Sequence, residues 1–195
     1  MRAWALILPV LAAAAPVAAA APAAAPSGAP AARTVDCGGR SIGTFRGVVG
    51  SPGSLRIGPL WLAFGGQAAA RAAPETLRDL GWWKMPALLR PGHTATLRIA
   101  ASHRRLAGWT YGPQAGVARR GVPAALRHTQ HTITLRACRP GVRPPDSTVD
   151  GRRVTFWSGG IVFTRAPLCV PVEVWVDEER RPRRTTLSLG AGRCR

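Results

Sequence analysis

The chain has 195 residues, with 27 Lys and Arg against nine Asp and Glu, and a formal net charge of +18. A charge of this size indicates salt-dependent attraction to anionic polymers. The scarcity of acidic residues argues against a glycosidase, which needs two carboxylates facing one cleft. Lys84 is the single lysine, and this arginine bias is also typical of a GC-rich genome, so a solvated surface with no partner is the alternative interpretation of the charge.

The N-terminus predicts a secretory signal peptide over residues 1–32. Met1-Arg2 is followed by "AWALILPVLAAAAPVAAAAPAAAP", which is rich in Ala and carries no charge, and several Ala-x-Ala steps suit a signal peptidase. The prolines in this segment argue against a retained helix, because interior prolines break helices. We therefore expect cleavage, with residues 33–195 forming a single secreted domain that is long enough to build its own core.

Four cysteines follow the signal segment: Cys37, Cys138, Cys169 and Cys194. An even count in an exported chain predicts two disulfides. We favour Cys138–Cys169 with Cys37–Cys194, and Cys37–Cys138 with Cys169–Cys194 remains open as the rival pairing. No C-x-x-C pair occurs, which argues against a zinc site.

Gly and Pro interrupt the rest of the chain about every ten residues, and the segments between them are typical of strands. In residues 93–102, Ala95, Leu97 and Ile99 point to one face and the polar residues between them to the other. This period of two is the signature of a half-buried strand. The predicted strands are 55–66, 81–92, 93–102, 105–112, 131–138 and 185–192.

One helix is predicted, within residues 68–81. Its second half, near 74–80, is the stronger part, because Pro74 suits the first turn of a helix and Gly81 suits its end.

The most apolar stretch after the N-terminus, residues 154–176, is about as long as a membrane span. A spanning helix needs about 20 apolar residues, whereas Gly159-Gly160, Arg165 and Glu173 interrupt this segment. A charge near the bilayer centre would be costly. We therefore predict two strands, with a bend at the glycine pair and a turn at "TRAPL", and no membrane span.

Together these elements predict an all-β fold, an immunoglobulin-like antiparallel β-sandwich of about seven to nine strands with one short helix near 74–80. Two basic loops, 139–153 and 177–184, should be exposed. Residues 112–127 are also expected to form a loose stretch.

No catalytic or cofactor motif is found. His128 and His131 stand three residues apart, and in an extended strand such positions face opposite sides. There is no Gly-x-Ser-x-Gly motif and no phosphate-binding glycine loop with a lysine. We therefore expect a non-enzymatic protein without cofactor or metal, and keep a secreted hydrolase or hydrolase inhibitor with an unrecognised site as the alternative.

The candidate binding surface lies on the arginine-rich loops with an exposed tryptophan beside them. Exposed aromatics next to arginine suit a sugar or polymer surface. The expected partners are anionic cell-wall polymers or lipid headgroups, and export together with the lack of a nucleic-acid motif argues against a specific nucleic-acid partner. The residues of this predicted surface are Arg152, Arg153, Arg180, Arg181, Arg183, Arg184 and Trp175.

The order of several short motifs resembles a loose group of uncharacterised secreted proteins from high-GC Gram-positive bacteria. The motifs are Lys84-Met85-Pro86 before "LLRPGHTATLRIA", "TLRAC" at 134–138, "WSGG" at 157–160, "PLCVPVEVWV" and "LSLGAGRC" at 187–194. The resemblance covers residues 37–194 and implies an exported, disulfide-bonded β-sandwich. It implies no activity, so no catalytic residue is carried over.

Overall fold

The computed structural model describes residues 32–112, 126–141 and 147–194, and strands dominate these ranges. The predicted signal segment and most of residues 112–127 lie outside them. The prediction of an all-β fold with a short helix is confirmed. The described ranges contain fourteen short strands where about seven to nine were predicted, because Pro and Gly divide several of the predicted strands in two.

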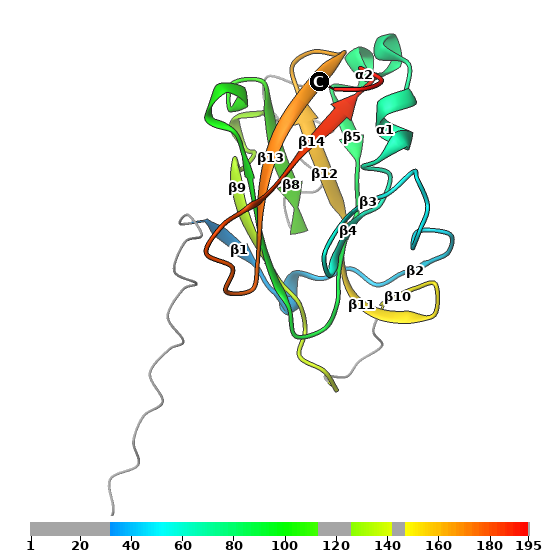
Figure 1. Cartoon of the computed structure of the whole chain (residues 1–195), viewed down its shortest axis with the longest axis vertical. Helices are drawn as coiled ribbons and strands as arrows, with labels where there is room; N and C mark the ends of the chain where they lie inside the picture. Colours follow the sequence, from blue (N-terminus) through cyan, green and yellow to red (C-terminus); the bar gives the residue numbers. More distant parts are fainter. Residues whose placement is uncertain (1–31, 113–125, 142–146, 195) are drawn as a thin grey trace, which may run out of the picture.

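One layer is a five-stranded sheet (Figure 1). Alternation places its apolar residues on one face, as predicted for residues 93–102. Its order is β1 (Arg33–Val35), β9 (Thr132–Arg136), β7 (Thr94–Ile99), β13 (Leu168–Val176) and β14 (Arg183–Leu189).

The opposite layer contains a six-stranded sheet. The stretch predicted as one strand over 55–66 is a hairpin in this sheet, because Gly58 turns the chain with a positive φ of 59°. The order is β2 (Thr44–Phe45), β10 (Ser147–Val149), β11 (Arg152–Trp157), β6 (Ala87–Leu89), β4 (Leu60–Leu62) and β3 (Leu55–Ile57).

A three-stranded sheet continues this layer around a bend. It contains β5 (Trp82–Lys84), β12 (Gly159–Phe163) and β8 (Ala107–Tyr111). The bend falls where β5 passes into β6 and β11 into β12, and the backbone N–H of Met85 donates to the carbonyl of Gly159 across it at 2.9 Å. The apolar stretch 154–176 is thus β11, β12 and β13, with the predicted bend at the glycine pair and a turn over 164–167. Within the described ranges, no helix is long and apolar enough to cross a membrane.

The main core fills the space between the two layers. The valines of β13 and the alternate apolar residues of β7 enter it from the five-stranded sheet, and Trp109, Trp157 and Phe163 enter it from the other layer. All three aromatic side chains are fully buried. Burying a large aromatic side chain removes 150–250 Å² from water, so these residues contribute much of the hydrophobic stabilisation.

Two short helices close one end of the sandwich beside β14 (Figure 1). They are α1 (Gln67–Arg71) and α2 (Pro74–Leu80), so the predicted second half of the helical stretch is confirmed. Gly81 ends α2 in the left-handed conformation, and its N–H donates to Leu77 at 2.8 Å. Ala72 and Ala73 are extended and separate α2 from α1. Ala73 avoids the helical region because it directly precedes Pro74.

The outer face of the six-stranded sheet carries a second, smaller apolar cluster around Trp61 and Leu88. The segment that covers it is held by one carboxylate. Asp150 accepts hydrogen bonds from the backbone N–H groups of Gly47, Val48 and Val49 at 2.5, 3.0 and 2.7 Å. These bonds, chiefly that from Val49, lower the pKa of Asp150.

Two strand pairs are parallel, which departs from the predicted antiparallel sandwich. β1 pairs with β9 and β2 pairs with β10 in the same direction. Both early strands are only two or three residues long, so neither carries an alternation from which its pairing can be predicted. The immunoglobulin-like topology stays a prediction.

The favoured disulfide pairing is wrong, and the rival pairing is present. The bridges join Cys37 to Cys138 and Cys169 to Cys194. The parallel pairing of β1 with β9 explains the first bridge, because parallel strands end at the same edge of a sheet. Cys37 and Cys138 each follow the end of one of these strands by two residues, and so lie side by side.

Candidate functional site

The outer face of the five-stranded sheet is polar, because every second residue of its central strands points away from the core. On β13 these residues include Glu173 and Trp175, and on β7 they include Arg98. The register places Glu173 opposite Arg98 on one side and opposite Arg184 of β14 on the other. Two guanidinium groups from different strands therefore flank one carboxylate.

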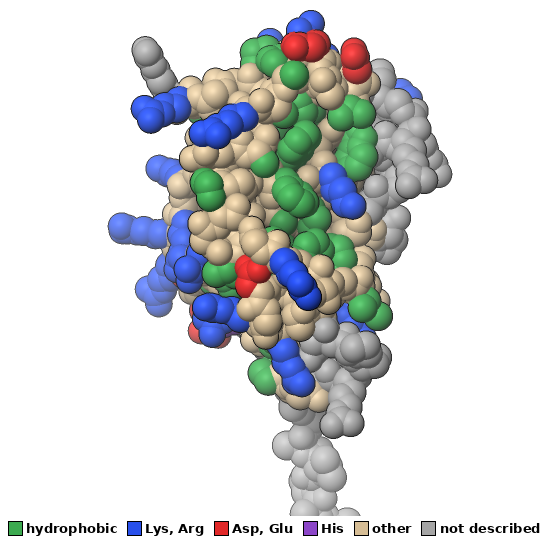
Figure 2. Space-filling model, turned by 90° about the vertical axis from the view of Figure 1, so that its right-hand side faces the viewer, with side chains coloured by type: hydrophobic (Ala, Val, Ile, Leu, Met, Phe, Trp, Pro, Cys, Tyr) green, Lys and Arg blue, Asp and Glu red, His purple; other side chains and the backbone are tan. Residues whose placement is uncertain are grey.

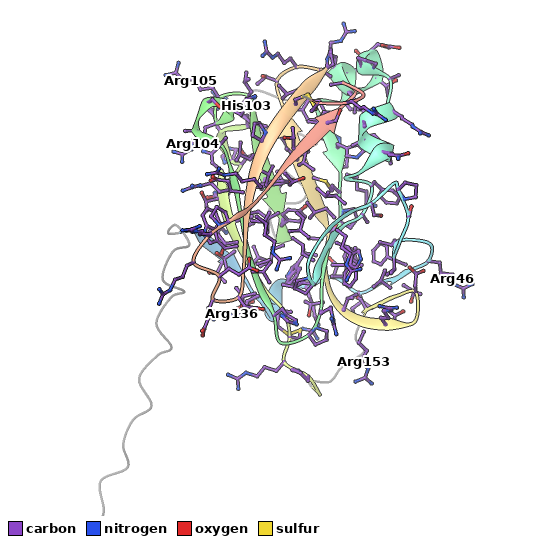
Figure 3. The ribbon with its side chains drawn as sticks, viewed as in Figure 1. Arg46, His103, Arg104, Arg105, Arg136 and Arg153 are labelled. Carbon is purple, nitrogen blue, oxygen red and sulfur yellow. A yellow bond between two sulfur atoms is a disulfide. The ribbon has the colours of Figure 1, made fainter. Side chains whose placement is uncertain are left out.

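A groove of about 630 Å³ lies on this face. It opens where β7 ends and the chain turns into a short 3₁₀ helix, Ala101–His103, beside β13 and β14. Arg104 stands at this end next to His103 and Arg105 (Figure 3). The lining residues are Arg98, Ala100, Ala101, Arg104, Pro171, Val172, Glu173, Arg184, Thr185 and Thr186.

Glu173 and Arg98 form the fixed part of the groove. The Nε and Nη2 atoms of Arg98 donate to Oε2 of Glu173 at 2.8 and 2.5 Å. Nε of Arg184 lies 3.5 Å from the other oxygen, Oε1. The side chain of Glu173 is only 18% exposed, whereas that of Arg184 is 82% exposed. Arg98 is thus held by its carboxylate, and Arg184 largely faces solvent.

Trp175 lies beneath Arg98, and its predicted exposure is wrong. The residue is only 4% exposed, and the guanidinium carbon of Arg98 stands 4.8 Å from its ring centroid. The residue does point away from the valine face, as the alternation predicts, but the arginine covers it. The indole serves as a platform that orients Arg98 by a cation–π contact.

The groove carries an excess of positive charge. Three arginines, Arg98, Arg104 and Arg184, surround the single carboxylate of Glu173, which leaves a formal charge of +2 (3 − 1). Among the residues that the structure describes, Arg104 forms no ion pair, and it is exposed. Two arginines of the groove are therefore oriented towards solvent and available to an anion.

The arginines predicted to form one binding surface do not come together. Arg152 and Arg153 begin β11 in the six-stranded sheet, and Figure 3 shows Arg153 at the opposite end of the molecule from Arg104. Arg180 and Arg181 are exposed in the turn between β13 and β14. Of the six predicted arginines, only Arg184 lines the groove.

Arg183 is occupied within the protein. Its Nε atom donates to both carboxylate oxygens of Glu179, at 3.0 and 3.2 Å. This hydrogen bonding raises the pKa of Arg183. Its guanidinium also lies against Gly58, where an added Cβ would come within 2.7 Å of Nη1. Arg183 thus joins the β13–β14 turn to the β3–β4 turn and is a structural residue.

The predicted exposed loop over 139–153 is only partly a loop. Residues 142–146 lie outside the described ranges, and Ser147–Val149 form β10, with Ser147 and Val149 buried. Polar residues dominate this stretch, so its pattern did not indicate a strand. The strand β10 is instead stabilised by its pairing with both β2 and β11.

Basic side chains also occur far from the groove. Figure 2 shows Lys and Arg scattered over the face turned towards the viewer, around a band of apolar side chains, with the acidic groups mainly at the top. The surface charge by itself therefore does not mark a site. The groove is distinguished by arginines that converge on one concave place.

Three groove residues, Arg98, Arg104 and Glu173, were not among the predicted site residues. Arg98 and Glu173 occupied the polar positions of their strands, so each was visible as an outward residue. Whether the two residues lie side by side depends on the register of β7 against β13. The alternation within a single strand does not determine that register.

Other polar clusters are small. His93 Nδ1 lies 2.7 Å from Oδ2 of Asp177, and Ser102 Oγ lies 2.9 Å from Nδ1 of His103 on the exposed surface. Within residues 32–112, 126–141 and 147–194, no group of three or more His, Cys, Asp or Glu side chains is arranged to hold a metal ion.

Comparisons with protein-family models, with curated proteins and with solved structures find no match.

Proposed function

We propose that this protein is a secreted, non-catalytic domain that binds an anionic polymer of the cell envelope through the groove on its five-stranded sheet. The observation that carries the proposal is the convergence of Arg98, Arg104 and Arg184 on a groove with a single carboxylate. The overall charge of +18 supports it, because a cationic protein concentrates anionic polymers near its surface.

The groove arginines have different tasks in this proposal. Arg98 is fixed on Trp175 and Glu173 and shapes the floor of the groove. Arg104 and Arg184 reach solvent and supply the contacts with anionic groups of the polymer. Arginine suits this task because its planar guanidinium binds carboxylate or phosphate oxygens through two parallel hydrogen bonds.

Export is part of the same proposal. Two disulfides with no free cysteine in the described chain support an oxidising compartment. The predicted signal peptide over residues 1–32 and the proposed loose association with the cell wall rest on the sequence. The immunoglobulin-like topology is likewise retained as a proposal.

The proposal is tested by retention on an immobilised polyanion over a range of salt concentrations. The double variant Arg104→Ala with Arg184→Ala should weaken binding about tenfold at low salt, since exposed ion pairs contribute up to about 1 kcal/mol each. The matched control is Arg46→Ala with Arg78→Ala, which removes the same charge elsewhere. Arg46 lies across the molecule from Arg104 (Figure 3), and Arg78 lies on α2 near Glu75.

The control variant should lose only the non-specific part of the binding, about twofold. Equal losses in the two double variants would mean that the groove has no special role and that the polymer binds to the general charge of the surface.

A further inference from the structure

We propose that the ligand of the groove is an acidic polysaccharide whose sugar rings carry both carboxylates and free hydroxyls, as in a polyuronate. This inference rests on the proposed function and adds the chemistry of the ligand. Anionic polymers that lack hydroxyl donors, such as polyphosphate, and anionic membranes are the competing ligands.

One carboxylate oxygen of Glu173 in the groove, Oε1, receives no hydrogen bond from the described residues. Both hydrogen bonds from Arg98 go to Oε2 of Glu173. Within the described residues, Oε1 accepts no hydrogen bond, and Nε of Arg184 approaches it only to 3.5 Å. Oε1 is not among the buried polar atoms that lack a partner, so solvent reaches it, and a ligand donor can replace water there.

A sugar hydroxyl is a donor of the required kind. A phosphate diester or polyphosphate chain offers only anionic oxygens at neutral pH, so Glu173 would repel it at short range. Glu173 therefore repels a phosphate polymer and accepts a hydrogen bond from a sugar hydroxyl. Specificity of this kind combines a repulsive contact with an attractive one.

Part of the groove lining is apolar. Ala100, Ala101 and Pro171 line the groove next to the charged groups. The C–H faces of a pyranose ring pack on apolar surfaces of this size, whereas a polyphosphate chain has no apolar face. Thr186, opposite Pro171 on the outer face, also lines the groove, and its hydroxyl offers a further hydrogen bond to a ring hydroxyl.

The charged groups of the groove come from three separate segments of the chain. Arg104 comes from the turn after β7 and Arg184 from β14, whereas Glu173 lies on β13 between β7 and β14. A polyuronate places carboxylates at intervals along the chain with hydroxyls between them. Carboxylates would then pair with Arg104 and Arg184 while a hydroxyl donates to Glu173.

The test compares four probes on the full chain: polygalacturonate, polygalacturonate acetylated on its ring hydroxyls, polyphosphate, and phosphatidylglycerol vesicles. Wild type should bind polygalacturonate about tenfold more tightly than polyphosphate. Acetylation keeps the carboxylates and removes the hydroxyl donors, so it should weaken binding about five- to tenfold. In Glu173→Ala this effect of acetylation should fall below about twofold, because the acceptor is gone.

The comparison forms a cycle between ligand and protein changes, which separates the hydroxyl–Glu173 contact from the added bulk of the acetyl groups. Glu173→Gln is the second variant and should also reduce the effect of acetylation, since Arg98 would hold the amide oxygen and the amide nitrogen would face the groove. Glu75→Gln, an exposed carboxylate on α2, is the control and should preserve the wild-type effect.

An effect of acetylation that is equal in wild type and in both Glu173 variants would overturn the inference. So would binding of polyphosphate, or of phosphatidylglycerol vesicles, as tightly as polygalacturonate with the same loss in Arg104→Ala with Arg184→Ala. Both results would leave the proposed anion-binding groove standing. If that double variant binds every probe like wild type, the proposed function itself fails.

Discussion

Replacement of Gly160 by alanine should strongly destabilise the protein, although it adds a single methyl group. Gly160 lies in β12, opposite Lys84 of β5. A Cβ at this position would lie 2.0 Å from the carbonyl oxygen of Trp83 and 2.9 Å from the backbone nitrogen of Met85. Ordinary contact begins at 3.4 Å, so the two strands would have to separate by about 1.4 Å (3.4 − 2.0).

The free-energy cost follows from the hydrogen bonds that such a movement breaks. The bond from Met85 to Gly159, at 2.9 Å, and the ladder bonding of β5 with β12 on the other side of the Gly160–Lys84 pair lie at the bend between the two parts of the layer. Breaking two buried backbone hydrogen bonds costs about 1–3 kcal/mol each. This cost is offset by about 0.4–1 kcal/mol, because alanine lowers the conformational entropy of the unfolded chain. The net loss should be about 3 kcal/mol.

Urea unfolding followed by tryptophan fluorescence measures this loss, and a thermal scan should show the melting temperature lowered by about 6–12 °C. Gly53→Ala is the matched control. Gly53 has no positive φ, and its added Cβ would meet Ser51 Oγ at 3.3 Å and Ala68 at 3.7 Å. Its stability should change by less than about 0.5 kcal/mol.

A Gly160→Ala protein within about 1 kcal/mol of wild type would refute this reasoning. It would mean that β5 and β12 separate at little cost, and that the bend does not depend on close approach of their backbones.

Two further predictions concern the bridges and the Asp150 contact. A non-reducing peptide map should recover Cys37 linked to Cys138, and replacing both by serine should cost about 2–5 kcal/mol in urea unfolding; recovery of a Cys37–Cys194 peptide would contradict the fold. The pKa of Asp150 is lowered, chiefly by the N–H of Val49, so its stabilising effect is present above the ordinary pKa of an aspartate and is lost as the pH falls through the lower folded-state value. Asp150→Asn should therefore be less stable than wild type near pH 7 and similar to it near pH 2, and an equal deficit at both pH values would contradict this assignment.

Local patterns predicted the elements well where the strand or helix carries its own signal. The alternation in 93–102 and 131–138 predicted β7 and β9, and Pro74 with Gly81 predicted the limits of α2. These features depend on residues close in sequence, so a single segment contains all the information.

Features that depend on pairing between distant segments were not predictable in the same way. β1 is three residues long, and its parallel pairing with β9 decides which cysteines meet. The groove depends on the register that sets Glu173 between Arg98 and Arg184. The burial of Trp175 likewise depends on an arginine from the neighbouring strand.

The connectivity of the bridges bears on how the chain would mature if it is exported as proposed. The cysteines pair in chain order, the first with the second and the third with the fourth: Cys37 with Cys138, and Cys169 with Cys194. If the chain crosses a membrane from its N-terminus, the correct partner of Cys37 is also the first one to arrive in the oxidising compartment. The pairing of Cys37 with Cys194 would instead have required Cys37 to stay unpaired until Cys138 and Cys169 had also entered that compartment. Maturation of this protein should therefore need little help from a disulfide isomerase.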